Sequence, residues 1–188
     1  KDFENGLANL KKYCEALAPK KYRGFAVLEA ERPITYYALL RQVVDFKDLS
    51  QYLSDHFPTL QQAAEKAGAK TTGFQSGFFW TYDTLAMKTD MAAAIPLDKQ
   101  VKMPDTIQVL SLGGKALQIE YLGDYDKAGE AHLAMDEYMA EKKLQNVPPV
   151  IEEYVVDANK EPDTAKWVMR VIYFVEPKRD STLLNEKK

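Results

Sequence analysis

Two short stretches of this sequence decide its fold, DYDKA at residues 124–128 and DFKDL at residues 45–49. In each stretch an aspartate precedes an aromatic residue at the head of a predicted helix, and these aromatic residues are 125 − 46 = 79 positions apart. Ile95 and Phe174, in the last predicted strand of each half, have the same separation, 174 − 95 = 79. Matching spacings of this kind indicate an internal repeat.

Each half shows the same order of predicted elements: strand, helix, strand, strand. β-Branched and aromatic residues favour the strands, and apolar residues at helical spacing follow both quoted stretches. We therefore expect an α+β fold of two β-α-β-β repeats with pseudo-twofold symmetry around a central groove, plus an N-terminal helix. The expected strands cover residues 25–29, 34–44, 72–83, 86–97, 106–112, 115–122, 150–156 and 167–175.

Proline and glycine residues are expected to interrupt these elements. Pro33 is expected to divide the first extended region into two strands, because proline cannot donate a hydrogen bond to a sheet. Pro58 is expected to interrupt the first helix, and Gly68 to end it. The pair Gly113-Gly114 is expected to form a hairpin turn between two strands.

Composition and charge exclude several classes of protein. The 188 residues carry a net charge of −3. Nucleic-acid-binding domains usually present a basic face, so we expect no direct nucleic acid binding by this chain. Cys14 is the only cysteine, and His56 and His132 are the only histidines. A disulfide and a Cys-rich or His-rich metal site are therefore excluded, and we expect no metal and no cofactor. The apolar runs are too short for the roughly 20 residues of a membrane span.

The start of the chain reads as a piece of a longer protein. The first residue, Lys1, is not methionine, and residues 1–17 carry apolar side chains at helical spacing. We expect residues 1–24 to be a helix and linker left from a preceding domain, residues 25–177 to form the main domain, and residues 178–188 to be a charged tail. The expected location is the cytoplasm, and a membrane tether in a missing N-terminal segment remains an alternative.

Aromatic residues concentrate in the predicted strands, and the chain has 11 Tyr, 8 Phe and 2 Trp. A seam between two repeats that is lined by aromatic side chains would form a concave, mostly apolar site. Strand alternation places Phe78, Trp80 and Tyr82 on one face and Phe79 on the other. We expect the first face to line the groove, with packing under a helix as the alternative reading.

The second half of the sequence also contains polar residues that are candidates for ligand binding. Glu153 and Tyr154 are neighbours in a strand, so only one can face the groove, and we favour Tyr154. Glu120 is either a groove carboxylate or a solvated residue. Arg170 and Tyr173 are expected on opposite faces of the last strand. The predicted ligand-binding residues are Phe78, Trp80, Tyr82, Glu120, Tyr154, Arg170 and Tyr173.

Motifs of the second half resemble a known family. They are LGDY at residues 122–125, GEA at 129–131, PVIEEY at 149–154, Pro162, and Trp167 before a closing apolar strand. In this order they resemble the GyrI-like domain, the effector-binding domain also fused to AraC-type and MerR-type multidrug-responsive regulators. The first half, with Phe57-Pro58 and Ile95-Pro96, is similar to the first repeat of that family, so the resemblance covers residues 25–177.

A second resemblance concerns the N-terminal segment. Residues 1–11, KDFENGLANLK, are similar to the last helix of a START-like (polyketide-cyclase-like) domain. In some bacterial proteins such a domain precedes a GyrI-like domain. The resemblance implies an upstream START-like domain in the full protein.

The GyrI-like resemblance implies a ligand groove between two β-α-β-β repeats. Members bind lipophilic, often cationic, aromatic compounds; some relatives hydrolyse strained electrophilic toxins, and one type inhibits DNA gyrase by protein contact. The family often places an acidic residue in the last strand, facing the groove. Arg170 stands at the matching position here, and the corresponding position of the first repeat falls near Ala92. With Arg170 there, we expect a preference for neutral or anionic ligands.

Three functions follow as hypotheses. The first is reversible binding of a small hydrophobic or aromatic molecule, in a ligand-sensing or sequestering domain with no catalytic residue. The second is hydrolysis of a strained electrophile by a glutamate, Glu120 or Glu153, beside Tyr154. The third is a protein-interaction module that inhibits an enzyme. A deep groove with an inward carboxylate beside a tyrosine would favour catalysis. A deep groove without such a carboxylate would favour binding alone. A filled groove would favour the protein-interaction module.

Overall fold

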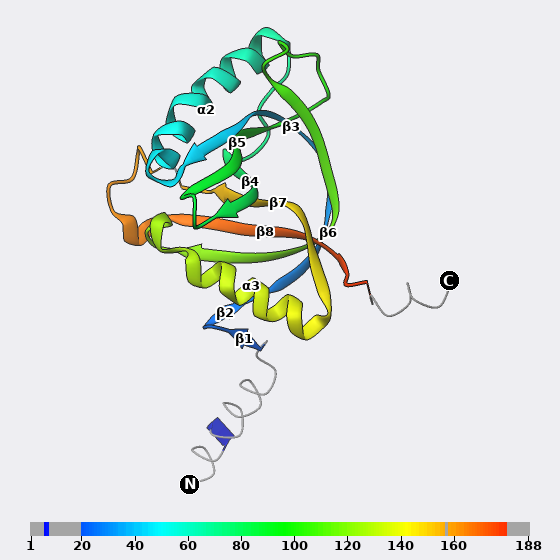
Figure 1. Ribbon diagram of the computed structural model, residues 1–188, viewed down its shortest axis with the longest axis vertical. Helices are drawn as coiled ribbons and strands as arrows, with labels where there is room; N and C mark the ends of the chain where they lie inside the picture. Colours follow the sequence, from blue (N-terminus) through cyan, green and yellow to red (C-terminus); the bar gives the residue numbers. More distant parts are fainter. Residues whose placement is uncertain (1–5, 8–19, 157, 180–188) are drawn as a thin grey trace.

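The computed structural model of the chain describes residues 6, 7, 20–156 and 158–179 (Figure 1). Residues 6 and 7 are helical, and the rest of the expected N-terminal helix lies outside the described residues. The elements are β1 (Lys21–Tyr22), β2 (Phe25–Ala26), β3 (Leu28–Asp45), η1 (Phe46–Asp48), α2 (Leu49–Lys66), β4 (Ser76–Asp83), β5 (Lys88–Leu97), β6 (Gln108–Leu122), η2 (Tyr125–Lys127), α3 (Gly129–Lys142), β7 (Leu144–Tyr154), η3 (Thr164–Lys166) and β8 (Val168–Pro177).

Six long strands close into an antiparallel barrel in the order β3-β5-β4-β7-β8-β6. The first repeat is β3-α2-β4-β5 and the second is β6-α3-β7-β8. Equivalent strands pair where the repeats meet, β3 with β6 and β4 with β7. Figure 1 shows α2 and α3 on opposite sides of the strands β4, β7 and β8. This arrangement confirms the expected α+β fold of two β-α-β-β repeats.

The repeat spacing holds at the helices and fails in the last strands. The short helices η1 and η2 begin at Phe46 and Tyr125, which are 79 residues apart as expected. Ile95, however, packs in the core cluster under α2, whereas Phe174 packs inside the barrel. Side chains alternate between the two faces of a strand, so a shift of one residue in the repeat reverses the face. The equivalence of Ile95 and Phe174 was therefore wrong.

Pro33 and Pro58 do not divide the elements that contain them. Strand β3 is continuous across Pro33, and the proline is absorbed by a shift in register between Arg32 and Thr35, as a bulge allows. Helix α2 continues through Pro58 as one helix. Its buried face, which includes Phe57 and Leu60, packs on the barrel and holds the helix together on both sides of the proline.

Gly113 and Gly114 lie within the long strand β6, and the expected hairpin turn was wrong. Strand β6 pairs with β3 on both sides of the glycines, opposite the bulge at Pro33. A Cβ atom on Gly113 would lie 2.8 Å from the Cα and backbone nitrogen of Ile34, and Gly114 has a φ of +111°. The glycines therefore allow two bent strands to approach closely where the barrel curves.

We expect Gly113→Ala to lower the free energy of unfolding by about 2–4 kcal/mol, because the added methyl group would displace the backbone at Ile34. Gly129→Ala is the matched control, since a Cβ at Gly129 meets nothing within 4 Å. Urea denaturation of both variants measures the difference. Equal midpoints for the two variants would contradict this account of the β3–β6 bend.

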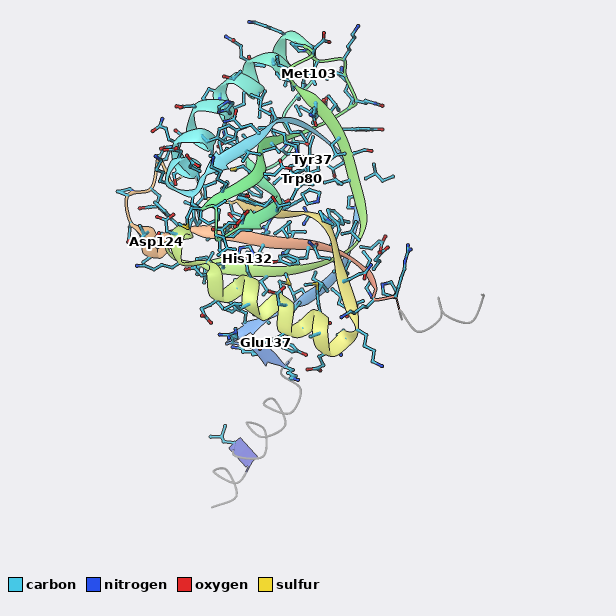
Figure 2. The ribbon with its side chains drawn as sticks, in the orientation of Figure 1. Tyr37, Trp80, Met103, Asp124, His132 and Glu137 are labelled. Atoms are coloured by element: carbon cyan, nitrogen blue, oxygen red, sulfur yellow. The ribbon has the colours of Figure 1, made fainter. Side chains whose placement is uncertain are left out.

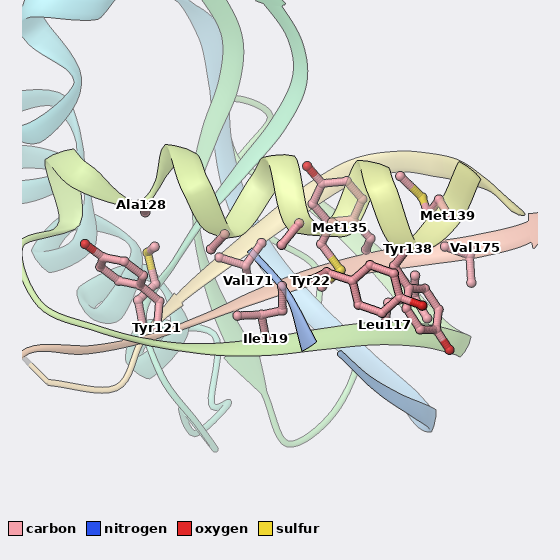
Figure 3. Packing of buried hydrophobic residues seen from close by; sticks show 14 residues of the cluster. Tyr22, Leu117, Ile119, Tyr121, Ala128, Met135, Tyr138, Met139, Val171 and Val175 are labelled. Carbon is pink, nitrogen blue, oxygen red and sulfur yellow. The ribbon is translucent and has the colours of Figure 1, made fainter. Parts of the chain in front are cut away.

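The hydrophobic core has three parts. One lies under α2, one lies under α3, and the third fills the barrel. Figure 3 shows the cluster under α3, where Met135, Tyr138 and Met139 pack on β6 and β8. The interior of the barrel is occupied by Tyr37, Leu39, Phe78, Ala92, Ala94, Ala116, Ile151, Ile172 and Phe174. Because the interior is filled, a ligand site must lie outside the barrel.

The β1–β2 hairpin packs against α3 and β6. Tyr22 is buried and meets Tyr138 edge-on, with ring centroids 5.1 Å apart. Arg23 forms ion pairs with Glu130 at 2.6 Å and Glu137 at 2.9 Å. Residues just before the main barrel are thus held against α3, the helix that carries His132.

Candidate functional site

A cavity of about 830 Å³ lies where the two repeats meet. Its floor is formed by the outer face of β4 and β7, and its walls by α2 and α3 with the short helices before them. Ligand pockets usually measure about 300–1,000 Å³, so the space suits a drug-sized molecule. Its aromatic lining consists of Phe46, Phe57, Phe79, Trp80, Tyr82, Tyr125, Tyr154, Trp167 and Tyr173.

The aromatic walls are held by ring contacts between elements that are distant in the sequence. Phe46 stacks on Tyr82, with ring centroids 4.3 Å apart, and so joins η1 to β4. Tyr125 packs against Tyr154 at 5.3 Å and Trp167 at 4.8 Å. These contacts prearrange the rings before any ligand binds, which reduces the entropic cost of binding.

A bulge in β4 decides which of its aromatic residues reach the cavity. The register with β5 shifts between Phe79 and Thr81, so Trp80 is the extra residue. Phe79, Trp80 and Tyr82 line the cavity, whereas Phe78 is fully buried inside the barrel. Phe78 and Trp80 share a face as expected, with ring centroids 6.2 Å apart, and Phe79 packs on the other side of the strand, in the cluster under α2. The expectation was wrong for Tyr82, because the bulge interrupts the alternation and turns Tyr82 to the cavity side together with Phe79.

The indole ring of Trp80 is held by a cation–π contact with Arg41. The guanidinium carbon of Arg41 lies 3.8 Å from the centre of the indole ring. Arg41 in turn donates two hydrogen bonds to Asp90, at 2.9 and 2.6 Å. These bonds hold the pKa of Asp90 below its usual value, so the pair stays charged at neutral pH.

Four polar side chains form a continuous hydrogen-bonded chain along the cavity. The Nδ1 atom of His132 lies 3.1 Å from the hydroxyl oxygen of Tyr173, and its Nε2 atom lies 3.0 Å from Oε1 of Glu152. The hydroxyl of Tyr154 donates to Oε2 of Glu152 at 3.1 Å. We call these residues, Tyr173, His132, Glu152 and Tyr154, the polar chain.

Burial and the carboxylate of Glu152 determine which groups of the polar chain carry a proton. Burial raises the pKa of Tyr154 well above its usual value, and the nearby charge of Glu152 raises it further. Burial also raises the pKa of Tyr173. Both phenols therefore keep their protons at neutral pH. A carboxylate only accepts hydrogen bonds, so the Nε2 atom of His132 carries a hydrogen that points to Glu152.

The charges around the cavity are mostly negative. Asp124, Asp126, Asp136 and Glu152 line it, and the lining, as far as the chain is described, contains no lysine and no arginine. Arg41, which contacts the ring of Trp80, is paired with Asp90. Burial raises the pKa of Asp136, and the charge of His132 acts in the opposite direction. The cavity thus offers a negative field within aromatic walls.

Asn146 is a further polar residue of the cavity lining. Its side-chain oxygen is buried and has no hydrogen-bond partner within the described part of the chain. A buried acceptor without a partner lowers stability.

Four of the seven predicted ligand-binding residues line the cavity: Trp80, Tyr82, Tyr154 and Tyr173. Figure 2 labels Trp80 together with Asp124 and His132, which reach the cavity from the second repeat. The other three predicted residues, Phe78, Glu120 and Arg170, lie elsewhere.

Arg170 and Glu120 face each other across β6 and β8, away from the cavity. The register pairs them directly, and their charged atoms are 4.0 Å apart. Arg170 also lies 3.6 Å from the buried carboxylate of Glu153, which Arg32 contacts as well. The charge of Arg170 is thus balanced by these carboxylates, and the argument for neutral or anionic ligands was wrong. Among the described strand residues that line the cavity, the acidic one is Glu152 in β7.

Several lining residues that were not predicted carry a signal in the sequence. The alternation that turns Tyr154 toward the cavity also turns Glu152 toward it, two residues earlier in the same strand. The repeat had already paired Phe46 with Tyr125, and both line the cavity. No sequence signal pointed to His132, because its partners come from other strands.

The described residues contain neither a metal-binding cluster nor a membrane-spanning helix. Among residues 20–156 and 158–179, no group of three His, Cys, Asp or Glu side chains is placed to hold a metal ion. In the same part of the chain, no helix combines the length and apolar character needed to cross a membrane.

The fold and the cavity together define a small-molecule-binding domain. The chain belongs to the GyrI-like small molecule binding domain family, whose model it matches over residues 30–174. A search among curated proteins finds no match.

Solved structures with the same fold include the C-terminal domain of EcmrR, at 17% identity and a TM-score of 0.70, covering 81% of this chain and 98% of that domain. EcmrR in a complex with DNA matches at 16% identity and a TM-score of 0.71, over 94% of this chain and 66% of that one. A hydrolase from Listeria innocua matches at 14% identity and a TM-score of 0.54, over 88% and 97% of the two chains. At these identities the likeness shows the fold alone.

Proposed function

We propose that this domain reversibly binds a small aromatic molecule, preferably one with positive charge, in the cavity between its repeats. The observation that carries the proposal is the carboxylate of Glu152, which is 19% exposed, within aromatic walls that contain no lysine or arginine among the described residues. A carboxylate in such surroundings loses part of its hydration, and a cation restores the lost stabilisation. The aromatic faces add attraction for the same charge.

The role proposed for this binding is ligand sensing within a larger protein, or sequestration of the ligand. The similar EcmrR C-terminal domain belongs to a protein whose structure was solved in a complex with DNA. This chain spans 66% of the EcmrR chain in that complex. A regulatory role therefore concerns the whole protein, while the described domain supplies the ligand cavity.

Three fluorescent probes of similar three-ring shape test the charge preference. N-methylacridinium is a permanent cation, anthracenemethanol is neutral, and anthracenecarboxylate is an anion. We expect the cation to bind at least about tenfold more tightly than the anion at neutral pH, with the neutral probe between them. Fluorescence titration gives the three dissociation constants. Tighter binding of the anion, or no binding of any probe, would overturn the proposal.

Hydrolysis of a strained electrophile is a second candidate, favoured by one contact. The hydroxyl of Tyr154 lies 3.1 Å from Glu152, so an inward carboxylate stands beside a tyrosine, although the glutamate is neither Glu120 nor Glu153. Such a pair can orient a water molecule and protonate a leaving oxygen. Turnover of styrene oxide to its diol, followed by chromatography, tests this activity. The open cavity, in contrast, does not meet the criterion for a protein-interaction module.

A further inference from the structure

We propose that His132 sets the charge preference of the cavity, because its protonated imidazole and a ligand cation compete for the same carboxylate, that of Glu152. This inference rests on the proposed function and adds a regulation of the same site by protons. It makes His132 a positioning and specificity-determining residue, and it predicts that cations bind above, and leave below, the pH at which His132 gains a proton.

The geometry places His132 between a hydroxyl group, which can donate or accept, and a carboxylate, which only accepts. Its ring is held at both nitrogens, at 3.1 Å by the Tyr173 hydroxyl and at 3.0 Å by Glu152. The imidazole side chain is 26% exposed and lines the cavity, so it contacts both the solvent and any occupant. A ring fixed in this way cannot turn away from Glu152 without breaking both bonds.

With a neutral ring, every hydrogen-bonding group of the polar chain has a partner. Tyr173 donates to Nδ1 of His132, Nε2–H donates to Oε1 of Glu152, and Tyr154 donates to Oε2. Glu152 then keeps its full negative charge, and the described lining offers no lysine or arginine to neutralise it. In this state the cavity attracts a cation.

With a protonated ring, the same contact becomes an ion pair. Both nitrogens of His132 now donate, Tyr173 turns its proton away and accepts from Nδ1–H, and the charge of Glu152 is balanced at 3.0 Å. The charge of the pair changes from minus one to zero. A ligand cation would therefore face an imidazolium ion beside its carboxylate, and its binding would weaken.

The charged and titratable groups that face His132 come from three elements. Asp136 stands one turn further along α3 and interacts with His132 through its charge. Glu152 and Tyr154 come from β7, and Tyr173 comes from β8. Two of these groups are carboxylates and none is basic, so no positive charge among them opposes the ion pair between His132 and Glu152.

The test compares wild type with His132→Gln, whose amide can still donate to Glu152 but cannot carry a charge. The dissociation constant of N-methylacridinium is measured from about pH 8 down to about pH 5.5, the range in which histidine titrates. We expect wild type to lose about tenfold or more in affinity, and H132Q to lose less than about threefold. Any titration of the carboxyl groups remains in both proteins, so the difference reports His132.

Three controls sharpen the comparison. His56→Gln removes the only other histidine, which lies on α2 outside the cavity lining, and should keep the wild-type profile. Asp136→Asn removes one of the two carboxylates and should move the midpoint of the profile to lower pH. Anthracenemethanol, which has no charge, should bind with little pH dependence in every variant.

A measurement on the unmodified protein guards against misfolding of the variant. In NMR spectra, saturation with N-methylacridinium should move the titration midpoint of the His132 ring protons to lower pH. An unmoved midpoint with the probe bound, or a wild-type pH profile retained in H132Q, would overturn the inference and leave the proposed function standing. Failure of all three probes to bind at any pH would overturn both.

Discussion

Replacing Glu152 with glutamine is expected to weaken binding of N-methylacridinium by about 10–100-fold, because the substitution removes the charge that faces the cation while keeping the shape of the side chain. The amide oxygen can still accept from Nε2–H of His132, and the amide nitrogen can donate to the hydroxyl oxygen of Tyr154, so both neighbours keep a hydrogen-bond partner. Anthracenemethanol should lose less than about threefold, since it presents no charge. Fluorescence titration of both probes gives the ratio.

Glu120→Gln is the matched control for this experiment. Glu120 is 57% exposed, pairs with Arg170 in the neighbouring strand, and does not line the cavity. The variant should bind both probes as wild type does. Equal losses in E120Q and E152Q would show that overall charge, rather than the cavity carboxylate, controls affinity. An unchanged affinity in E152Q would remove the main support for a cationic ligand.

Replacing Phe78 with alanine is expected to lower the free energy of unfolding by about 3–5 kcal/mol, the usual cost of removing a phenylalanine from a core. Its side chain is fully buried in the barrel and meets Tyr37 at a ring-centroid distance of 5.0 Å. Barrel strands on both sides close around it, so the space cannot collapse easily. Urea denaturation of wild type and variant measures the loss.

Tyr82→Ala separates a core role from a ligand-contact role in the same strand. Tyr82 is 60% exposed, lines the cavity and stacks on Phe46. Its loss should change stability by less than about 1 kcal/mol and weaken probe binding. If F78A instead folded with wild-type stability and lost probe binding, Phe78 would be a ligand contact, as its place in the sequence pattern had indicated.

Much of the fold could be predicted because its signals are local. The start of each helical region is marked by an aspartate followed by an aromatic residue. Both short helices begin where expected, at Phe46 and Tyr125. The turn between β4 and β5 follows from neighbouring residues in the same way. What failed were features that depend on pairing with another strand. Gly113 lies within a strand only because Ile34 on β3 crosses it closely.

The candidate site was predicted only in part, for the same reason. Aromatic residues in strands could be named, and Trp80, Tyr82, Tyr154 and Tyr173 do line the cavity. Alternation alone could not reveal the bulge at Trp80, because a bulge is defined by the strand that pairs with it. Alternation also could not show that Arg170 is paired with the carboxylates of Glu120 and Glu153.

The sequence by itself determined the order of the elements, the repeat, the number of aromatic side chains in the strands and the membership of a small-molecule-binding family. Each of these features depends on short runs of neighbouring residues. Only the tertiary structure decided which carboxylate faces the cavity and what holds it. His132 meets Tyr173 and Glu152 across 41 and 20 residues of chain, respectively. Contacts over such distances arise when the barrel closes and α3 packs on it, and no local pattern records them.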